Sequence, residues 1–128
     1  MTIKEKWQGA VTDGSGFVAI PVALFRLQTK LKLTPTDMVV LANLLVHWWD
    51  PERGVFPRST TIAVRMGVAK RTVQRSTQKL IKSGLMHRDF LEVGEKKRRV
   101  FQFTALAERL AREIGFSYQL AGKESLGA

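Results

Sequence analysis

The spacing of apolar and polar positions predicts helices in the first two thirds of the chain and a β-hairpin after them. Residues 35–49 repeat apolar side chains three and four positions apart, from Met38 to Trp48, as one face of an α-helix requires. Thr34 offers a hydroxyl N-cap and Pro35 a suitable first helical residue. This helix is apolar on most faces, so we expect it to be central or to lie at an interface.

The segment 59–83 keeps helical periodicity on both sides of a single break near Gly67. A glycine there supplies the positive φ that a sharp turn between two helices needs. Val68 is expected to close the core at the turn, and Val73 to anchor the second helix. This combination predicts a helix-turn-helix.

Two β-prone segments follow, at 85–91 and 100–103, and they flank the polar stretch 93–99. We expect a hairpin with a basic tip. Thr104 can cap a final helix, which we expect to end at Gly115. The predicted fold is mainly α with a small β-hairpin, a winged helix-turn-helix.

The remaining segments give the expected domain limits. Residues 1–16 read as a flexible N-terminal arm, and 116–128 as a frayed C-terminal tail. The domain then spans 17–115. It starts with a short strand at 17–20 and a short helix at 22–31.

Positive charge is concentrated on the predicted helix-turn-helix and hairpin. The 128 residues carry a net charge of +10, and segment 58–99 holds twelve Lys or Arg against three acids. Charge gathered in this way indicates a polyanionic partner. Because it falls on a helix-turn-helix pattern, we expect double-stranded DNA.

The second helix separates into an apolar face and a basic face. Val73 and the apolar residues that follow it at helical spacing face inward. The opposite face carries Lys70, Arg71, Gln74, Arg75, Gln78 and Lys82. Since the start of this helix enters the major groove in such motifs, we expect Arg71, Gln74 and Arg75 at base edges. Thr72 is expected at a thymine methyl or a phosphate.

Further DNA contacts are expected from two other places: a wing that would contact phosphate or reach the minor groove, and the start of the first helix, which would contact phosphate. The predicted wing carries Lys96, Lys97, Arg98 and Arg99. These residues would add salt-dependent affinity. Ser59 at a helix N-terminus and Arg58 beside it are further candidates, because free backbone N–H groups attract anions there.

Several strings resemble the helix-turn-helix family of plasmid and phage replication initiators and small bacterial regulators. The strings are Phe56–Ala63, Met66–Val68, Arg71–Arg75 and Leu80–Met86. They are similar to that family's first helix, Gly-Val turn, recognition helix and entry to the wing. Ala69 departs from the family's usual serine, which removes an N-cap worth about 1 kcal/mol. The family's initiators usually continue into further domains, whereas this chain stops.

Other chemistries find little support. Cysteine is absent, and the two histidines, His47 and His87, lie forty positions apart without a matching carboxylate. We expect no metal, no cofactor and no enzymatic activity. No apolar run reaches the roughly 18 residues of a membrane span, and the N-terminus lacks a signal-peptide core. We therefore expect a cytoplasmic protein, associated with the nucleoid when bound.

Three functions stay open. The first is a sequence-specific DNA-binding transcriptional regulator of a bacterial or mobile-element operon, acting as a homodimer through helix 35–49 or the final helix. The second is a plasmid or phage replication-initiation or partition factor that binds origin repeats. The third is a non-specific nucleic-acid-binding module, for which the basic wing alone would suffice.

Overall fold

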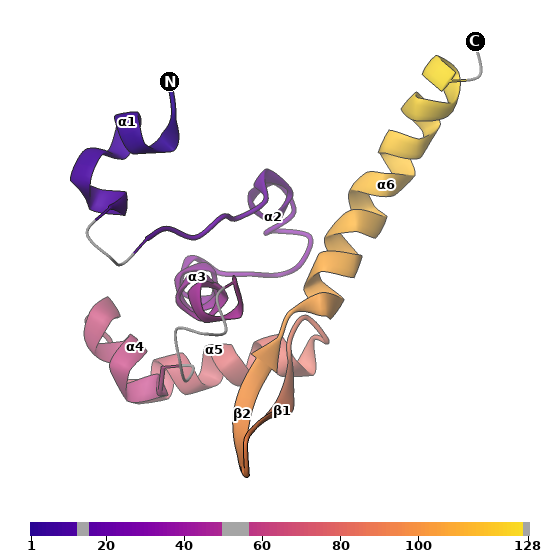
Figure 1. Ribbon diagram of the computed structural model, residues 1–128. Helices are drawn as coiled ribbons and strands as arrows, with labels where there is room; N and C mark the ends of the chain where they lie inside the picture. Colours follow the sequence, from indigo (N-terminus) through magenta and orange to yellow (C-terminus); the bar gives the residue numbers. More distant parts are fainter. Residues whose placement is uncertain (13–15, 50–56, 127–128) are drawn as a thin grey trace.

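The structure is a computed structural model that describes residues 1–12, 16–49 and 57–126. It leaves out the side chains of residues 49, 91, 93, 98 and 116–126. The stretch 50–54 contains Pro51 and Gly54, from which the sequence predicts a break after helix 35–49, but it lies outside the described residues. The elements in order are α1 (Ile3–Trp7), the 3₁₀ helix η1 (Gln8–Val11), α2 (Val22–Arg26), α3 (Pro35–Trp49), α4 (Ser59–Met66), α5 (Lys70–Lys82), β1 (His87–Val93), β2 (Lys96–Gln102) and α6 (Thr104–Leu126) (Figure 1).

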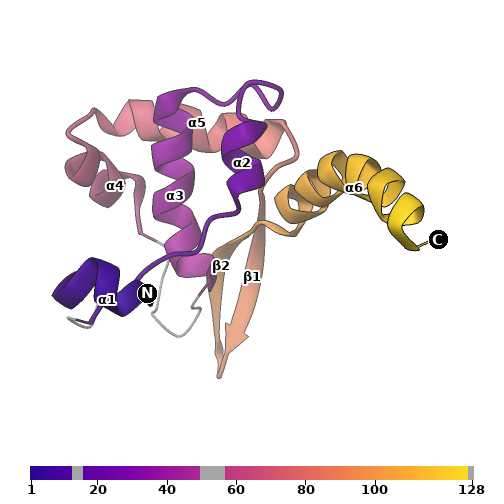
Figure 2. The ribbon, with the colours of Figure 1, turned by 90° about the horizontal axis from the view of Figure 1, so that it is seen from above.

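Helix α3 lies at the centre of the core and crosses α5 at a steep angle (Figures 1 and 2). Val40 and Leu41 of α3 are fully buried, as is Val73 of α5. The central position predicted from the sequence is therefore confirmed. Among the described side chains of α3, Val39 is the one large apolar residue left exposed. Most of this helix is thus already covered by its own chain.

The start of α3 is capped as its sequence predicts. The Thr34 hydroxyl accepts a hydrogen bond from the Asp37 backbone N–H (3.1 Å). The Asp37 carboxylate in turn accepts the Thr34 N–H (2.9 Å). Two N–H groups that have no partner within the helix are satisfied by this reciprocal pair.

Three segments near the N-terminus differ from the prediction. Residues 17–20 are not in a strand; the structure has one sheet in its described part, made of β1 and β2. Val18 and Ile20 pack against the core, so their apolar character reflects burial rather than strand pairing. The expected helix at 22–31 ends at Arg26 and continues as turns. Helical turns at 3–11 also occupy the segment that we expected to be a loose arm.

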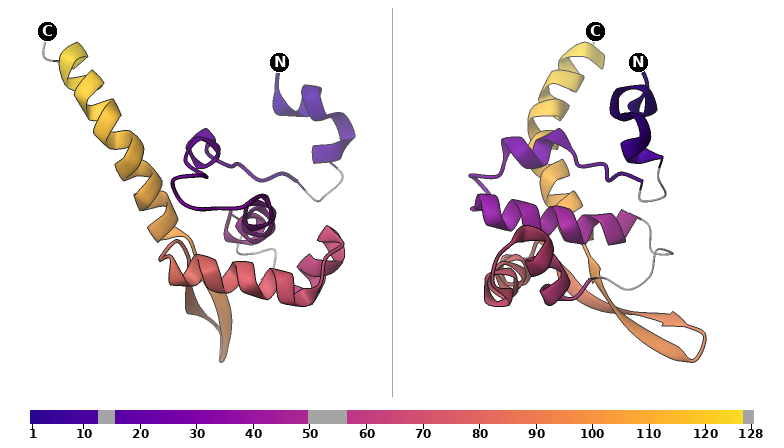
Figure 3. Two further views of the ribbon diagram at one scale, coloured as in Figure 1. Left: turned by 180° about the vertical axis from the view of Figure 1, so that it is seen from behind. Right: turned by 90° about the vertical axis from the view of Figure 1, so that its left-hand side faces the viewer.

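The final helix is longer than predicted. It continues through Gly115 and reaches Leu126. Gly115 does not adopt a positive φ, so it forms no helix-ending cap. A glycine inside a helix costs only about 1 kcal/mol relative to alanine, so it does not by itself end the helix. The hairpin and α6 leave the body in opposite directions (Figures 1 and 3).

No helix in the described part of the chain has the length and apolarity needed to cross a membrane.

Candidate nucleic-acid interface

The turn between α4 and α5 has the geometry that the sequence predicts. Gly67 adopts a left-handed conformation (φ 67°, ψ 33°) at the C-terminus of α4. The N–H of Val68 reaches back to the carbonyl of Ala63 (3.0 Å), which closes the helix end. Val68 itself is exposed rather than part of the core, because the turn carries its side chain outward. Helix α5 begins at Lys70. Ala69 occupies its N-cap position and makes no side-chain hydrogen bond there.

Helix α5 has one buried face and one exposed face, as predicted. Val73, Thr77 and Leu80 are buried, and Ile81 packs against the core. The exposed residues are Lys70, Arg71, Gln74, Arg75, Gln78 and Lys82, while Thr72 is half-buried. Every expected base-reading side chain is therefore accessible on one face of this helix.

A polar cluster lies on the inner side of α5, and the sequence analysis did not identify it. Asp37 is only 3% exposed. Its carboxylate accepts hydrogen bonds from the Ser76 hydroxyl (2.7 Å) and the Lys79 ammonium group (2.5 Å). Burial raises the pKa of Asp37, but the hydrogen bonds from Lys79, Thr34 and Ser76 outweigh it and hold the pKa below its ordinary value of 3.8. The pattern Thr34-x-x-Asp37 signals a cap, but nothing in the sequence signals its contact with α5.

The wing places its basic residues differently from the prediction. Lys96, Lys97, Arg98 and Arg99 lie along β2, and the turn consists of Gly94 and Glu95. Gly94 has a φ of 65°, which allows this two-residue turn. The expected basic tip is therefore wrong, because β1 extends two residues past position 91 and β2 begins four residues before position 100.

Strand pairing divides the basic run between two faces. Lys97 pairs with Glu92 and Arg99 pairs with Phe90, so Lys97 and Arg99 share a face. Lys96 lies on the opposite face. The side chain of Arg98 is outside the described residues. Lys96, Lys97 and Arg99 are all exposed.

A hollow of about 550 Å³ separates α5 from the wing. We call it the wing groove. Its lining includes Arg58 and Ser59 from the start of α4, Gln74 and Gln78 from α5, and Arg88 and Arg99 from the hairpin. The wing groove thus brings four expected site residues, from the start of α4 and from α5, next to Arg99 of the wing. Lys70 and Arg71 do not line it.

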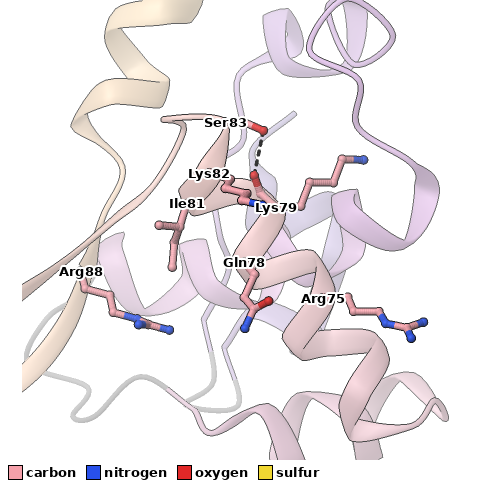
Figure 4. Close-up of a pocket in the computed structure, with 7 residues that line it drawn as sticks. All are labelled: Arg75, Gln78, Lys79, Ile81, Lys82, Ser83 and Arg88. Atoms are coloured by element: carbon pink, nitrogen blue, oxygen red, sulfur yellow. Dashed lines mark hydrogen bonds between the residues drawn. The ribbon is translucent and has the colours of Figure 1, made fainter.

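Arg88 is a site residue that the sequence analysis missed. It also lines a second hollow, of about 650 Å³, beside the C-terminal half of α5. Figure 4 shows Arg88 extending from the hairpin on one side of Gln78, with Arg75 on the other. The Ser83 hydroxyl closes the last turn of α5 by donating to the Lys79 carbonyl (2.7 Å). Arg88 lies opposite Phe101 in the hairpin and therefore on the same face as Arg99. The register of the two strands was thus the signal that could have identified it.

The wing is held to the helical body at its base. Trp48 near the end of α3 donates from Nε1 to Oε1 of Gln102 (3.1 Å). Its ring meets Phe103 edge-on, with ring centroids 5.7 Å apart. Phe103 is fully buried. This hydrogen bond and the packing of Phe103 join the base of the hairpin to the end of α3.

Chemically, this surface offers guanidinium, ammonium and amide groups on three neighbouring elements. Such groups bind phosphate oxygens and the edges of bases. Within the described ranges, no three His, Asp or Glu side chains gather in a way that could hold a metal ion.

Comparisons with known proteins agree with this geometry. Residues 31–86 match a family model described as a helix-turn-helix domain. A search of curated proteins gives no match. The chain is similar to the crystal structure of the N-terminal domain of DnaD protein from Geobacillus kaustophilus HTA426, with a TM-score of 0.64 and 21% sequence identity. That match covers 96% of this chain and 99% of the other. At this identity the likeness shows the fold alone. Residues 31–86 are thus similar to helix-turn-helix domains, and the two-stranded hairpin that follows them gives the fold of a winged helix-turn-helix.

Proposed function

We propose that this protein binds double-stranded DNA at a defined sequence and regulates transcription of a bacterial or mobile-element operon. One observation carries the proposal: α5 presents Arg71, Gln74 and Arg75 together on an exposed face, beside a basic wing. The helix-turn-helix match supports DNA binding. The proposed role is binding rather than catalysis, without a cofactor, and in the cytoplasm.

In this proposal the N-terminal half of α5 enters the major groove. Arg71 and Arg75 suit guanine and Gln74 suits adenine, each through two hydrogen bonds to a base edge. Lys97 and Arg99 of the wing contact phosphate, as do Arg58 and the backbone at the start of α4. The helix would supply sequence discrimination, and the wing would supply salt-dependent affinity.

We further propose that the protein acts as a homodimer. Two copies would double the sequence that is read and would place half-sites about one helical turn apart. Because α3 is largely buried, α6 is the stronger candidate for the contact. Light scattering coupled to size exclusion, with and without DNA, tests this. A monomer under both conditions would contradict it.

The central experiment selects binding sites from randomised duplexes and repeats the measurement with variants over a salt series. Arg71→Ala should relax the selected motif at one position. Lys97→Ala should weaken all duplexes similarly and reduce the slope of log K against log salt by about one. If no motif emerges and both variants merely lower affinity, the protein is a non-specific nucleic-acid-binding module.

A second candidate is a replication-initiation or partition factor that binds origin repeats. The strings between Phe56 and Met86 that resemble replication initiators favour it. It predicts a selected motif that recurs as direct repeats, and co-purification of a helicase or primase. A palindromic motif at a promoter would favour the regulator.

A further inference from the structure

The polar cluster beneath α5 has a geometry that ordinary core packing does not require. Asp37 of α3, Ser76 and Lys79 of α5 form it, and we call these three residues the α3–α5 clamp. Its carboxylate is 3% exposed and accepts three donors, from Ser76, Lys79 and the Thr34 backbone. Two of those donors lie one turn apart on the helix that carries the proposed base-reading residues.

The packing of α3 against α5 does not depend on the clamp. Val40 and Leu41 of α3 and Val73 and Leu80 of α5 are each fully buried in the same core. Asp37 is buried, but the Lys79 side chain is 38% exposed, and an ion pair with an exposed partner contributes little to stability. Thr77 is the other buried polar residue of α5. Its hydroxyl donates to the Val73 carbonyl of the same helix (2.9 Å) and, among the described residues, bonds to no other element. The clamp therefore has a consequence other than adhesion.

That consequence is orientation. Apolar burial has no preferred direction, so it tolerates small rotations and slides of one helix on another. Hydrogen bonds from Ser76 and Lys79 to the two oxygens of one carboxylate fix both the rotation and the height of α5. A rotation of about 10° would move a guanidinium about 7 Å from the helix axis by about 1.2 Å. This exceeds the range of about 0.5 Å over which an N–H···O bond keeps its length.

We propose that Asp37 is a positioning residue for sequence readout: the clamp fixes α5 so that Arg71, Gln74 and Arg75 meet base edges together. Phosphate contacts by flexible Lys and Arg side chains tolerate a shifted helix, whereas bidentate base contacts do not. Losing the clamp therefore lowers discrimination between sequences while general affinity for DNA persists. This inference rests on the proposed sequence-specific binding.

The test compares the wild-type chain with the triple variant Asp37→Asn, Ser76→Ala, Lys79→Met. Asparagine keeps an acceptor for the Thr34 N–H, and alanine and methionine are good helix formers. One negative and one positive charge are removed, so the net charge is unchanged. The measured quantity is the ratio of dissociation constants for random duplex and for the selected motif, on protein shown by circular dichroism to be folded.

We expect the ratio to fall at least about fivefold, the low end for one lost bidentate contact. Affinity for random duplex and its salt slope should stay close to wild type. Lys82→Met is the matched control, because it removes an exposed cation from the same helix. It should weaken both duplexes alike and preserve the ratio. A smaller fall in the triple variant overturns the proposal.

Three further outcomes are decisive. If the triple variant does not fold, Ser76→Ala alone removes one donor; a fall in the ratio of about twofold or more supports the clamp, and a smaller one overturns it. If the wild-type chain selects no motif, the proposed function and this inference fail together. If it selects a motif that the triple variant reads equally well, only the inference fails.

Discussion

Trp48 and Gln102 join the end of the central helix to the base of the wing through a hydrogen bond of 3.1 Å. These residues are 54 positions apart in the chain. Trp48→Phe keeps an aromatic ring against Phe103 but removes the indole N–H. The half-buried amide oxygen of Gln102 then lacks this hydrogen-bond donor. We expect a loss of about 0.5–1.5 kcal/mol in the free energy of unfolding, measured by urea titration.

Trp7→Phe is the control for that measurement, because Trp7 is exposed and lies on α1, outside the core. It should leave the free energy of unfolding unchanged. Equal effects from the two substitutions would show that the Trp48–Gln102 bond contributes nothing specific.

Arg88 lines both hollows beside α5, so its removal should weaken DNA binding. Arg88→Ala should lower affinity for all duplexes alike and reduce the salt slope by about one. Fluorescence anisotropy over a salt series measures both quantities. Arg112→Ala removes an exposed cation from α6, away from the hollows, and should change neither. A salt slope for Arg88→Ala equal to that of the wild type would remove Arg88 from the interface.

Ala69 occupies the N-cap position of α5 with the backbone angles of a capping residue (φ −69°, ψ 146°) but without a side-chain acceptor. Ala69→Ser should therefore stabilise the protein by about 1 kcal/mol and raise the melting temperature by about 3–6 °C. Ala111→Ser, at an exposed position inside α6, should instead lower stability slightly. Thermal unfolding of both variants checks the difference in sign.

The lowered pKa of Asp37 predicts how stability depends on pH. Since the pKa in the folded state lies below 3.8, the carboxylate stabilises the fold fully above that value. This contribution is lost as the pH falls through the folded-state pKa. Asp37→Asn should therefore flatten the dependence of the unfolding free energy on pH between about pH 5 and pH 2.

Glu113 must be separated from Asp37 in that experiment. Hydrogen bonds from Lys30 and Arg109 hold its pKa below its ordinary value of 4.5. Glu113→Gln should remove a different part of the same acid response. If Asp37→Asn leaves the pH dependence as in wild type, the clamp does not favour the charged carboxylate.

Local sequence rules predicted the parts of the fold that depend on local geometry. Helical spacing identified the buried face of α5 from Val73 onward, and the need for positive φ identified Gly67 as the turn. The same rules predicted the hairpin but misplaced its strand limits, because charged residues such as Lys96 and Lys97 have low strand propensity and join β2 through pairing with the opposite strand. They were wrong at Gly115 because a glycine ends a helix only when the backbone turns left-handed.

The residues that were missed depend on contacts between distant segments. Asp37 meets Ser76 across 39 positions, and a period of 3.6 residues cannot reveal a partner on another helix. Arg88 belongs to the candidate site because the chain reverses at Gly84 (φ 73°), between α5 and β1, and brings it back beside α5. From the sequence alone, an inward polar residue such as Ser76 looks like any other helix position, because the side chain on the neighbouring helix that it contacts is unknown.

The division of the wing's cations between two faces has a consequence for how the protein meets a polyanion. In the proposed complex with DNA, Lys96 on one side of the hairpin and Lys97 and Arg99 on the other would attract the polyanion from more than one direction. Helix α5 carries its exposed cationic and amide groups on a single face, so it would favour one docking direction over its reverse. The wing would thus serve the first encounter, and α5 the final orientation.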